Sequence, residues 1–216
     1  MTGTFSRLPD GIVTAWCKRN GGFCWRPAGS LFDLGSKLPC GVSVVVCTKD
    51  RPRSLQRFLE SLQSQDRVPD ELVVVDASEG DETDGVVRAF AVTSGFDVTY
   101  VRVSAPLRGL TKQRNLGARM VRYDLLAFFD DDVVLEPSCL AAMEEAHRLH
   151  NSLVVGVGAR IAGAGQVPRI WRTRLWLGIV PDLKPGRNHR SGMSTPWAFP
   201  EVPQKLLDVD YLPGGA

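Results

Sequence analysis

The chain has 216 residues, 44% of them hydrophobic and 23% charged, and a formal net charge of +2. These values are ordinary for a globular protein, and they lack the strong basic excess of a dedicated nucleic-acid-binding protein. No stretch reaches the roughly 18 consecutive apolar residues that a membrane span needs, and no signal-peptide core follows Met1. We therefore expect a cytoplasmic protein with one good-sized domain and no nucleic-acid partner.

Residues 1–40 precede the first regular pattern. They contain glycine and proline breakers and no sustained period of a helix or a strand, so we predict an irregular N-terminal lead without an assigned function. The chain has an odd number of cysteines and no CxxC pair, which favours reduced thiols. The five are Cys17, Cys24, Cys40, Cys47 and Cys139.

Strand-like and helix-like stretches alternate after Gly41. The predicted strands are 42–47, 71–76, 97–103 and 125–129, and the predicted helices are one that begins at Pro52 and those over 83–91, 109–121 and 137–149. The first helix carries an apolar stripe that should face a sheet, formed by Leu55, Phe58, Leu59 and Leu62. This alternation is typical of parallel βαβ units, so the predicted fold is α/β, a doubly wound and mostly parallel sheet flanked by helices.

The C-terminal part is less regular and more basic. We predict a strand over 153–161, whereas 168–188 mixes tryptophans and arginines with breakers. Seven lysines and arginines lie between Arg160 and Arg190, against Asp182 alone. Cations and aromatic rings suit the anionic face of a membrane, which indicates peripheral membrane contact; a solvated loop is the alternative interpretation.

Three consecutive carboxylates, Asp130, Asp131 and Asp132, follow an apolar strand that ends in Phe128-Phe129. Adjacent acids repel one another, so a positive partner is expected. Mg²⁺ or Mn²⁺ would relieve the repulsion, because both ions accept carboxylate oxygens. An acidic surface loop is the alternative, but a strand with two phenylalanines favours a metal site.

Polar residues follow the other predicted strands as well. They are Thr48 and Asp50 after the first strand, Asp76 after the second, and Lys112 and Arg114 on the helix before the acids. Ligands bind at the carboxyl ends of strands in open α/β sheets, and these side chains suit a nucleotide. Neither GxGxxG nor GxxxxGK[ST] is present, so metal and cationic side chains would have to hold the phosphates.

Five ordered strings resemble family 2 glycosyltransferases with the GT-A fold. They are Val-Ser-Val-Val-Val-Cys-Thr-Lys-Asp-Arg (42–51), Val-Val-Val-Asp-Ala-Ser (73–78), Thr-Lys-Gln-Arg-Asn-Leu-Gly (111–117), Phe-Phe-Asp-Asp-Asp-Val (128–133) and Leu-Pro-Gly-Gly-Ala (212–216). The resemblance implies inverting transfer of a sugar from a nucleotide-diphosphate sugar, with a UDP-sugar favoured. The acceptor would be a carbohydrate or a lipid-linked hydroxyl in cell-envelope or polysaccharide biosynthesis, in the cytoplasm or at the cytoplasmic face of the membrane.

The resemblance also implies roles for single residues. Thr48 would lie beside the base, Asp76 would accept a base N–H, Arg114 would help to hold the nucleotide, and Asp131 would lie near the ribose. Asp132, with Asp130, would form the metal-binding DxD motif. Local alternatives stay open: Asp76 can cap its own turn, Arg114 can be a solvated helix charge, and Thr48 can belong to an ST-turn.

The family's general base follows the Pro-Gly-Gly turn and is expected beyond Ala216. Residues 41–150 would then be the nucleotide-sugar-binding half and 151–216 the start of an incomplete acceptor-side region, in a truncated chain that binds donor. The alternatives are a non-catalytic nucleotide-sugar-binding module and a sugar nucleotidyltransferase, although the glycine-rich loop of the latter is missing at 47–52.

Overall fold

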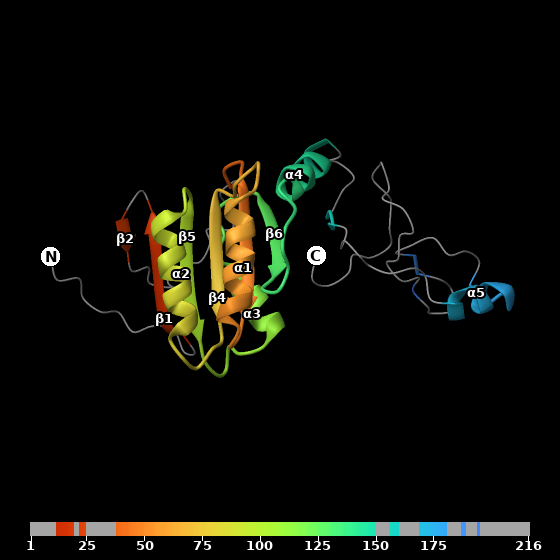
Figure 1. Cartoon of the computed structure of the whole chain (residues 1–216), viewed down its shortest axis with the longest axis horizontal. Coiled ribbons are helices and arrows are strands. Elements are labelled where there is room, and N and C mark those ends of the chain that lie inside the picture. Colours follow the sequence, from red (N-terminus) through yellow and green to blue (C-terminus); the bar gives the residue numbers. More distant parts are fainter. Residues whose placement is uncertain are drawn as a thin grey trace. The chain divides into compact units, whose positions relative to one another are not determined.

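The computed structural model describes residues 12–19, 22–24, 38–149, 156–159, 169–180, 187–188 and 194. The chain divides into two compact units, Met1–Glu144 and Glu145–Ala216. The first unit holds the sheet and the helices that cover it (Figure 1).

The sheet has six strands in the order β2-β1-β5-β4-β3-β6. Its bounds are β1 Ile12–Arg19, β2 Gly22–Cys24, β3 Val42–Thr48, β4 Glu71–Asp76, β5 Asp97–Val103 and β6 Leu125–Asp130. The pairs β5–β4, β4–β3 and β3–β6 are parallel, whereas β1 pairs antiparallel with β5 and with β2. The predicted α/β fold with a mostly parallel sheet is confirmed.

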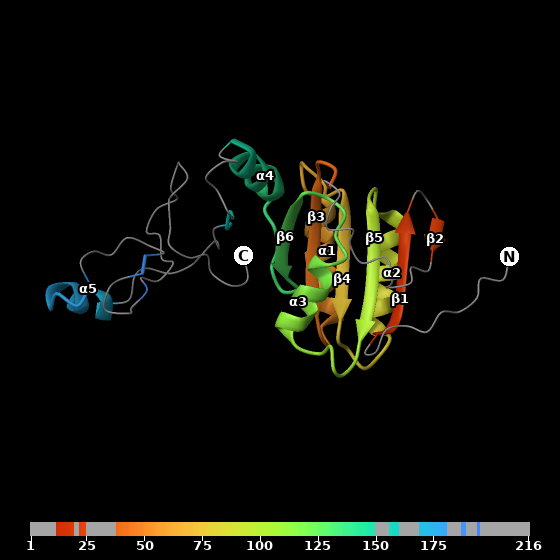
Figure 2. The same ribbon diagram turned by 180° about the vertical axis from the view of Figure 1, so that it is seen from behind.

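Helices cover both faces of this sheet. The covering helices are α1 Pro52–Gln63, α2 Glu82–Thr93 and α3 Leu110–Ala118, and α4 Cys139–Leu149 follows β6. Alternate strand residues point to opposite faces, so Val44 and Val46 pack with α1 and α2, while Val45 packs with α3. Figures 1 and 2 show α1 and α2 on one face and α3 on the other.

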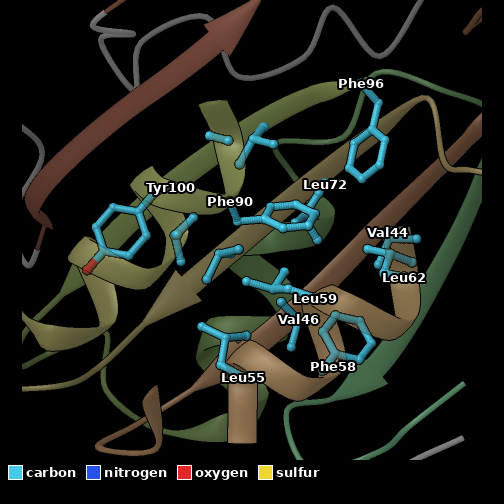
Figure 3. Close-up of a cluster of buried hydrophobic side chains, with 14 of the residues drawn as sticks. Val44, Val46, Leu55, Phe58, Leu59, Leu62, Leu72, Phe90, Phe96 and Tyr100 are labelled. Carbon is cyan, nitrogen blue, oxygen red and sulfur yellow. The ribbon is translucent and has the colours of Figure 1, made fainter. Parts of the chain in front are cut away.

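The predicted stripe of α1 is confirmed. Leu55, Phe58, Leu59 and Leu62 are all at most 1% exposed, and they pack against Val46 and its neighbours (Figure 3). Pro52 begins the helix, where a missing N–H costs no hydrogen bond. Burial of these four side chains fixes α1 to the sheet and so fixes the loop that joins β3 to α1.

The direction of the strand connections changes beside β3. The chain moves from β3 through β4 to β5, and α3 then returns it across the sheet to β6 on the other side of β3. Gly117 allows α3 to approach β3 closely, because a Cβ there would lie 2.4 Å from Val45 Cγ1. The carboxyl ends of β3 and β6 therefore lie side by side at a switch point, where open α/β sheets bind ligands.

The N-terminal segment corrects two expectations. Residues 12–19 and 22–24 are strands rather than an irregular lead; the consecutive apolar residues Ala15, Trp16 and Cys17 hide the alternation of a strand. Cys17 is disulfide-bonded, so reduced thiols were wrong for this residue; its partner in the strand register is Cys24. Cys40, Cys47 and Cys139 are free, as expected.

The second unit contains helix α5, Arg169–Trp176. Residues 156–159, the described part of the predicted strand 153–161, are not in a strand, and two of these four residues are glycines. Within the described ranges, no helix is both long and apolar enough to cross a membrane.

Candidate ligand site at the carboxyl ends of the strands

Thr48 and Asp131 join the two strands at the switch point. Thr48 is the last residue of β3 and only 2% exposed, and its hydroxyl donates a hydrogen bond of 2.7 Å to Asp131 Oδ2. Because this hydrogen bond goes to the end of the neighbouring strand, the Thr48 hydroxyl does not form the ST-turn of the alternative interpretation. It fixes the first residue after β6 and thereby the course of the acidic loop.

Two arginines offset the charge of the three acids. Arg114 Nη2 lies 2.8 Å from Asp130 Oδ1, and its guanidinium lies 5.9 Å from the ring centroid of Phe128. Arg51 Nη1 lies 3.4 Å from Asp131 Oδ1 and 3.2 Å from Asp132 Oδ2. The structure therefore brings Arg114 to the acids, as the sequence predicted, and adds Arg51.

The acids differ in exposure, and this decides which of them can reach a ligand. The Asp132 side chain is 54% exposed and that of Asp130 is 35% exposed, whereas Asp131 is 8% exposed. In the described residues, no three His, Cys, Asp or Glu side chains form a ready metal-binding group. The donor set still fits Mg²⁺ or Mn²⁺, since such ions take one or two carboxylates and complete their shell with water and phosphate oxygens.

Asp76, at the end of β4, is fully buried. Its Oδ1 accepts the Ser78 N–H at 2.7 Å, and its Oδ2 accepts the Tyr100 hydroxyl at 2.7 Å. The first bond is the turn cap that was the alternative interpretation. Burial raises the pKa of Tyr100, and the nearby Asp76 carboxylate also raises it. The Tyr100 hydroxyl therefore stays protonated and remains a hydrogen-bond donor.

Asp50 shapes the loop beside Asp76. Its φ of 54° is in the left-handed region, which aspartate tolerates better than most residues. Its N–H donates to Ser78 Oγ at 2.7 Å, and its Oδ1 accepts the Glu79 N–H at 3.3 Å. The exits of β3 and β4 are therefore joined to each other, with Asp50 exposed at the surface.

Lys112 is exposed, and its hydrogen bond goes to a residue other than the three acids. Its Nζ donates to the Pro106 carbonyl at 2.9 Å, within the loop that precedes α3. The structure therefore does not join Lys112 to the three acids, although both belong to the same edge of the sheet.

Gln113 was missed in the sequence analysis. It is 5% exposed, and its Nε2 donates to the carbonyls of Thr48 at 3.2 Å and Val75 at 2.9 Å. One amide thus ties α3 to the ends of β3 and β4. The only signal in the sequence was its place between Lys112 and Arg114.

Cys47 lies opposite Asp130 in the strand register but does not behave as a metal ligand. Its pKa is raised to about 12, mainly by burial; Arg114 lowers it, and the Asp130 and Asp131 carboxylates raise it. The thiol is therefore protonated at neutral pH, and the carboxylates are the metal-binding candidates of this edge.

The fold and this edge define a class of protein: an α/β domain with a cluster of acidic residues at the switch point of a mostly parallel sheet. The family model for glycosyl transferase family 2 matches residues 43–199. The chain belongs to this family, and the resemblance noted in its sequence is confirmed.

Two curated relatives are glycosyltransferases by name. The chain is 31% identical over 122 residues to a glucosyl-dolichyl phosphate glucuronosyltransferase of Haloferax volcanii, covering 56% of this chain and 38% of the relative. It is 29% identical over 98 residues to a hyaluronan synthase of Pasteurella multocida, covering 45% of this chain and 10% of the relative. The chain thus spans less than half the length of either relative.

Solved structures give more distant similarities. The mannosyltransferase PcManGT from Pyrobaculum calidifontis, in complex with GDP-Man and Mn²⁺, has a TM-score of 0.48 at 24% identity, covering 66% of this chain and 42% of that one. S. aureus TarS has a TM-score of 0.43 at 22% identity, covering 56% of this chain and 24% of that one.

Proposed function

We propose that this chain is the donor-binding part of a metal-dependent, inverting glycosyltransferase that uses a nucleotide-diphosphate sugar. The observation that carries the proposal is that the three acids differ in exposure and in hydrogen-bond partners. Asp131 is buried and fixed by Thr48, while Asp132 and Asp130 keep exposed carboxylates at the switch point. A fixed backbone with reachable oxygens suits a metal-bridged diphosphate.

The residues at this edge have distinct proposed roles. Asp132, with Asp130, would hold Mg²⁺ or Mn²⁺. When bound, the ion supplies Lewis-acid stabilisation of the negative charge that develops on the leaving diphosphate. Arg114 holds Asp130 in place and presents a cation to the nucleotide, and Lys112 adds a second cation from the same helix. We assign no general base among the described residues.

A UDP-sugar is the favoured donor. Asp50 offers an exposed carboxylate beside the β3 and β4 exits, and Thr48 is the buried last residue of β3. An Asp76 contact to a uracil N–H would require the base to share this carboxylate with Tyr100 or Ser78, which its remaining lone pairs permit. Because Asp76 is fully buried, this contact would also require the loop after β4 to open.

The side chains of helix α5 and Leu177 favour the proposal that the acceptor lies at a membrane surface, as a lipid-linked sugar would. Trp176 is 83% exposed and Leu177 57% exposed, and the helix contains three arginines and no acid. Apolar side chains beside cations suit an anionic lipid surface. The named activity of the Haloferax volcanii relative, on a dolichyl phosphate, agrees with such an acceptor.

Calorimetric titration of UDP into the purified chain, with Mn²⁺ and with EDTA, tests the donor site. The proposal expects binding that requires Mn²⁺ and exceeds that of GDP and ADP. Equal binding with EDTA would remove the metal from the proposal, and the absence of binding with Mn²⁺ would refute the donor site. Binding without transfer from any UDP-sugar to added acceptors would favour a non-catalytic module.

Sedimentation with vesicles tests the membrane contact separately. The chain should sediment with phosphatidylglycerol vesicles and not with phosphatidylcholine vesicles, and Arg169→Gln with Arg172→Gln should weaken the binding. The matched control is Arg53→Gln with Arg57→Gln, which removes two exposed arginines from α1. Failure of the parent chain to sediment would end this part of the proposal.

A further inference from the structure

We propose that Arg51 is an exchangeable counter-ion of the donor site: it neutralises Asp132 before the metal binds, and it moves to the diphosphate when the metal takes its place. This inference rests on the proposed function, because it assumes that Asp132 is a metal ligand. It adds a residue that had no role among the expectations from the sequence. It also gives the site two states that differ in which cation Asp132 holds.

The position of Arg51 on helix α1 gives the first argument. Arg51 is the N-cap residue, its carbonyl accepts the Leu55 N–H at 3.1 Å, and its side chain makes no capping hydrogen bond. A cation at a helix N-terminus opposes the helix dipole, and the favoured N-cap residues are serine, threonine, aspartate and asparagine. Helix stability therefore does not explain an arginine here.

The contacts of its guanidinium give the second argument. A single nitrogen, Nη1, lies within ion-pair distance of both Asp131 and Asp132, at 3.4 Å and 3.2 Å. Neither contact is the parallel two-nitrogen pairing that makes arginine–carboxylate pairs strong. The Arg51 side chain is 57% exposed, so water screens both contacts. Arg51 is held loosely enough to leave.

Competition for one oxygen gives the third argument. Arg51 approaches Asp132 at Oδ2, and a divalent ion bound to that carboxylate would meet the guanidinium at short range and repel it. The diphosphate that arrives with the ion carries the negative charge that would receive the displaced arginine. Its phosphate oxygens also match the fork geometry of a guanidinium.

Arg114 provides the contrast within the same site. It lies 2.8 Å from Asp130, its side chain is 27% exposed, and it packs near the Phe128 ring. A shorter contact and an aromatic neighbour hold this arginine in place. The inference therefore concerns Arg51 alone: Arg114 stays with Asp130, and Arg51 exchanges.

The test measures two affinities that should change in opposite directions. In Arg51→Gln, binding of Mn²⁺ alone, followed by the electron paramagnetic resonance signal of the free ion, should tighten about threefold or more, because the competing cation is gone. Binding of UDP in the presence of saturating Mn²⁺ should weaken about tenfold, because a charged contact to phosphate is lost. Arg57→Gln, an exposed arginine further along α1, should change neither affinity.

Arg51→Lys separates charge from geometry. It keeps a competing cation, so binding of Mn²⁺ alone should stay near that of the parent, while UDP binding should weaken because an ammonium cannot make the two-nitrogen contact. A merely structural role would move both affinities downward in Arg51→Gln, and that result overturns the exchange. Equal Mn²⁺ affinity of Arg51→Gln and the parent, including no measurable binding to either, also overturns it.

Failure of this inference and failure of the proposed function give different results. If the parent chain binds no UDP with Mn²⁺, the donor site itself fails, whatever Arg51 does. If the parent binds UDP with Mn²⁺ and Arg51→Gln leaves both affinities unchanged, the donor site stands and the exchange alone is refuted.

Discussion

The two ends of the parallel strands use the same kinds of charge in different ways. At the amino end, Glu71 is 1% exposed; its carboxylate accepts the Ser43 hydroxyl at 2.7 Å and Arg122 Nε at 2.8 Å, and Arg122 also pairs with Asp97 at 2.5 Å. At the carboxyl end, Asp132 is 54% exposed and contacts Arg51 through one nitrogen.

This difference separates a structural network from a ligand site. A buried carboxylate whose oxygens have protein partners holds strands and loops together, and removing a partner leaves a buried charge unpaired. An exposed carboxylate with a weak partner adds little stability and remains available to a ligand. Each of the following changes tests one side of that contrast.

Glu71→Ala should have the largest effect. It removes the buried acceptor shared by the Ser43 hydroxyl and Arg122, which keeps its contact with Asp97, and should lower the free energy of unfolding by about 3 kcal/mol. Denaturant unfolding measures this loss. Glu60→Ala, which removes an exposed acid of α1, should stay within about 0.5 kcal/mol of the parent. A loss below about 1 kcal/mol for Glu71→Ala would show that the network contributes little.

Gly117→Ala tests the packing that brings α3 to the ligand site. The new Cβ would lie 2.4 Å from Val45 Cγ1, so overpacking should cost about 1–3 kcal/mol of stability. Adding Val45→Ala removes the clash. The measurement is a double-mutant cycle: the cost of Gly117→Ala should largely vanish in the Val45→Ala background, and an unchanged cost would contradict the close approach.

Tyr100→Phe tests the support of Asp76 from the buried side. It leaves Asp76 Oδ2 without its hydroxyl donor in the fully buried site, which should cost about 1–3 kcal/mol. Thermal and denaturant unfolding measure the loss. Tyr123→Phe, which removes the hydroxyl of a half-buried tyrosine and also keeps the ring, provides the matched control.

The smallest effect on stability is expected at the cysteines, where the rates of thiol labelling should nevertheless differ clearly between Cys40 and Cys47. Cys40 is exposed, whereas burial raises the pKa of Cys47 to about 12. At pH 8, a thiol reagent should label Cys40 quickly and Cys47 very slowly, because the thiolate is the reactive form. Peptide mass spectrometry after timed quenching distinguishes the sites, and equal labelling would contradict the burial of Cys47.

The same pKa sets a direction for stability. The unfolded thiol ionises near its ordinary value of 9.0, while the folded thiol keeps its proton to about 12. Stability from Cys47 is therefore fully present below pH 9 and is lost as the pH rises from there towards 12. Cys47→Ala should flatten the fall of unfolding free energy in this window.

The parts of the fold that were predictable have local causes. Two predicted features depend only on residues within one element, and both are confirmed. They are the strand at 42–47 and the apolar stripe formed by Leu55, Phe58, Leu59 and Leu62. The strand β1 was not predicted because Ala15, Trp16 and Cys17 are consecutive apolar residues, so its sequence does not alternate. Asn20-Gly21, a dipeptide typical of tight hairpins, was the available signal for the β1–β2 pair.

The site was predictable only where a strand end marks it. Asp130, Asp131 and Asp132 stand out because they follow an apolar strand, and Arg114 lies near them as expected. The partners of Asp76 and Thr48 were not predictable, since Tyr100 is 24 positions from Asp76 and Asp131 is 83 positions from Thr48. Those pairs depend on the strand order, which sequence periodicity does not specify.

The most direct test of the contrast compares Asp132→Asn with Asp66→Asn, measuring both unfolding free energy and UDP affinity with Mn²⁺. Asp66 is an exposed acid just after α1, near the amino end of β4 and so away from the ligand site. We predict that Asp132→Asn weakens UDP binding at least about tenfold and leaves stability unchanged, while Asp66→Asn changes neither. Parent-like UDP binding by Asp132→Asn, or a loss of stability in its place, would contradict the assignment of this edge as the ligand site.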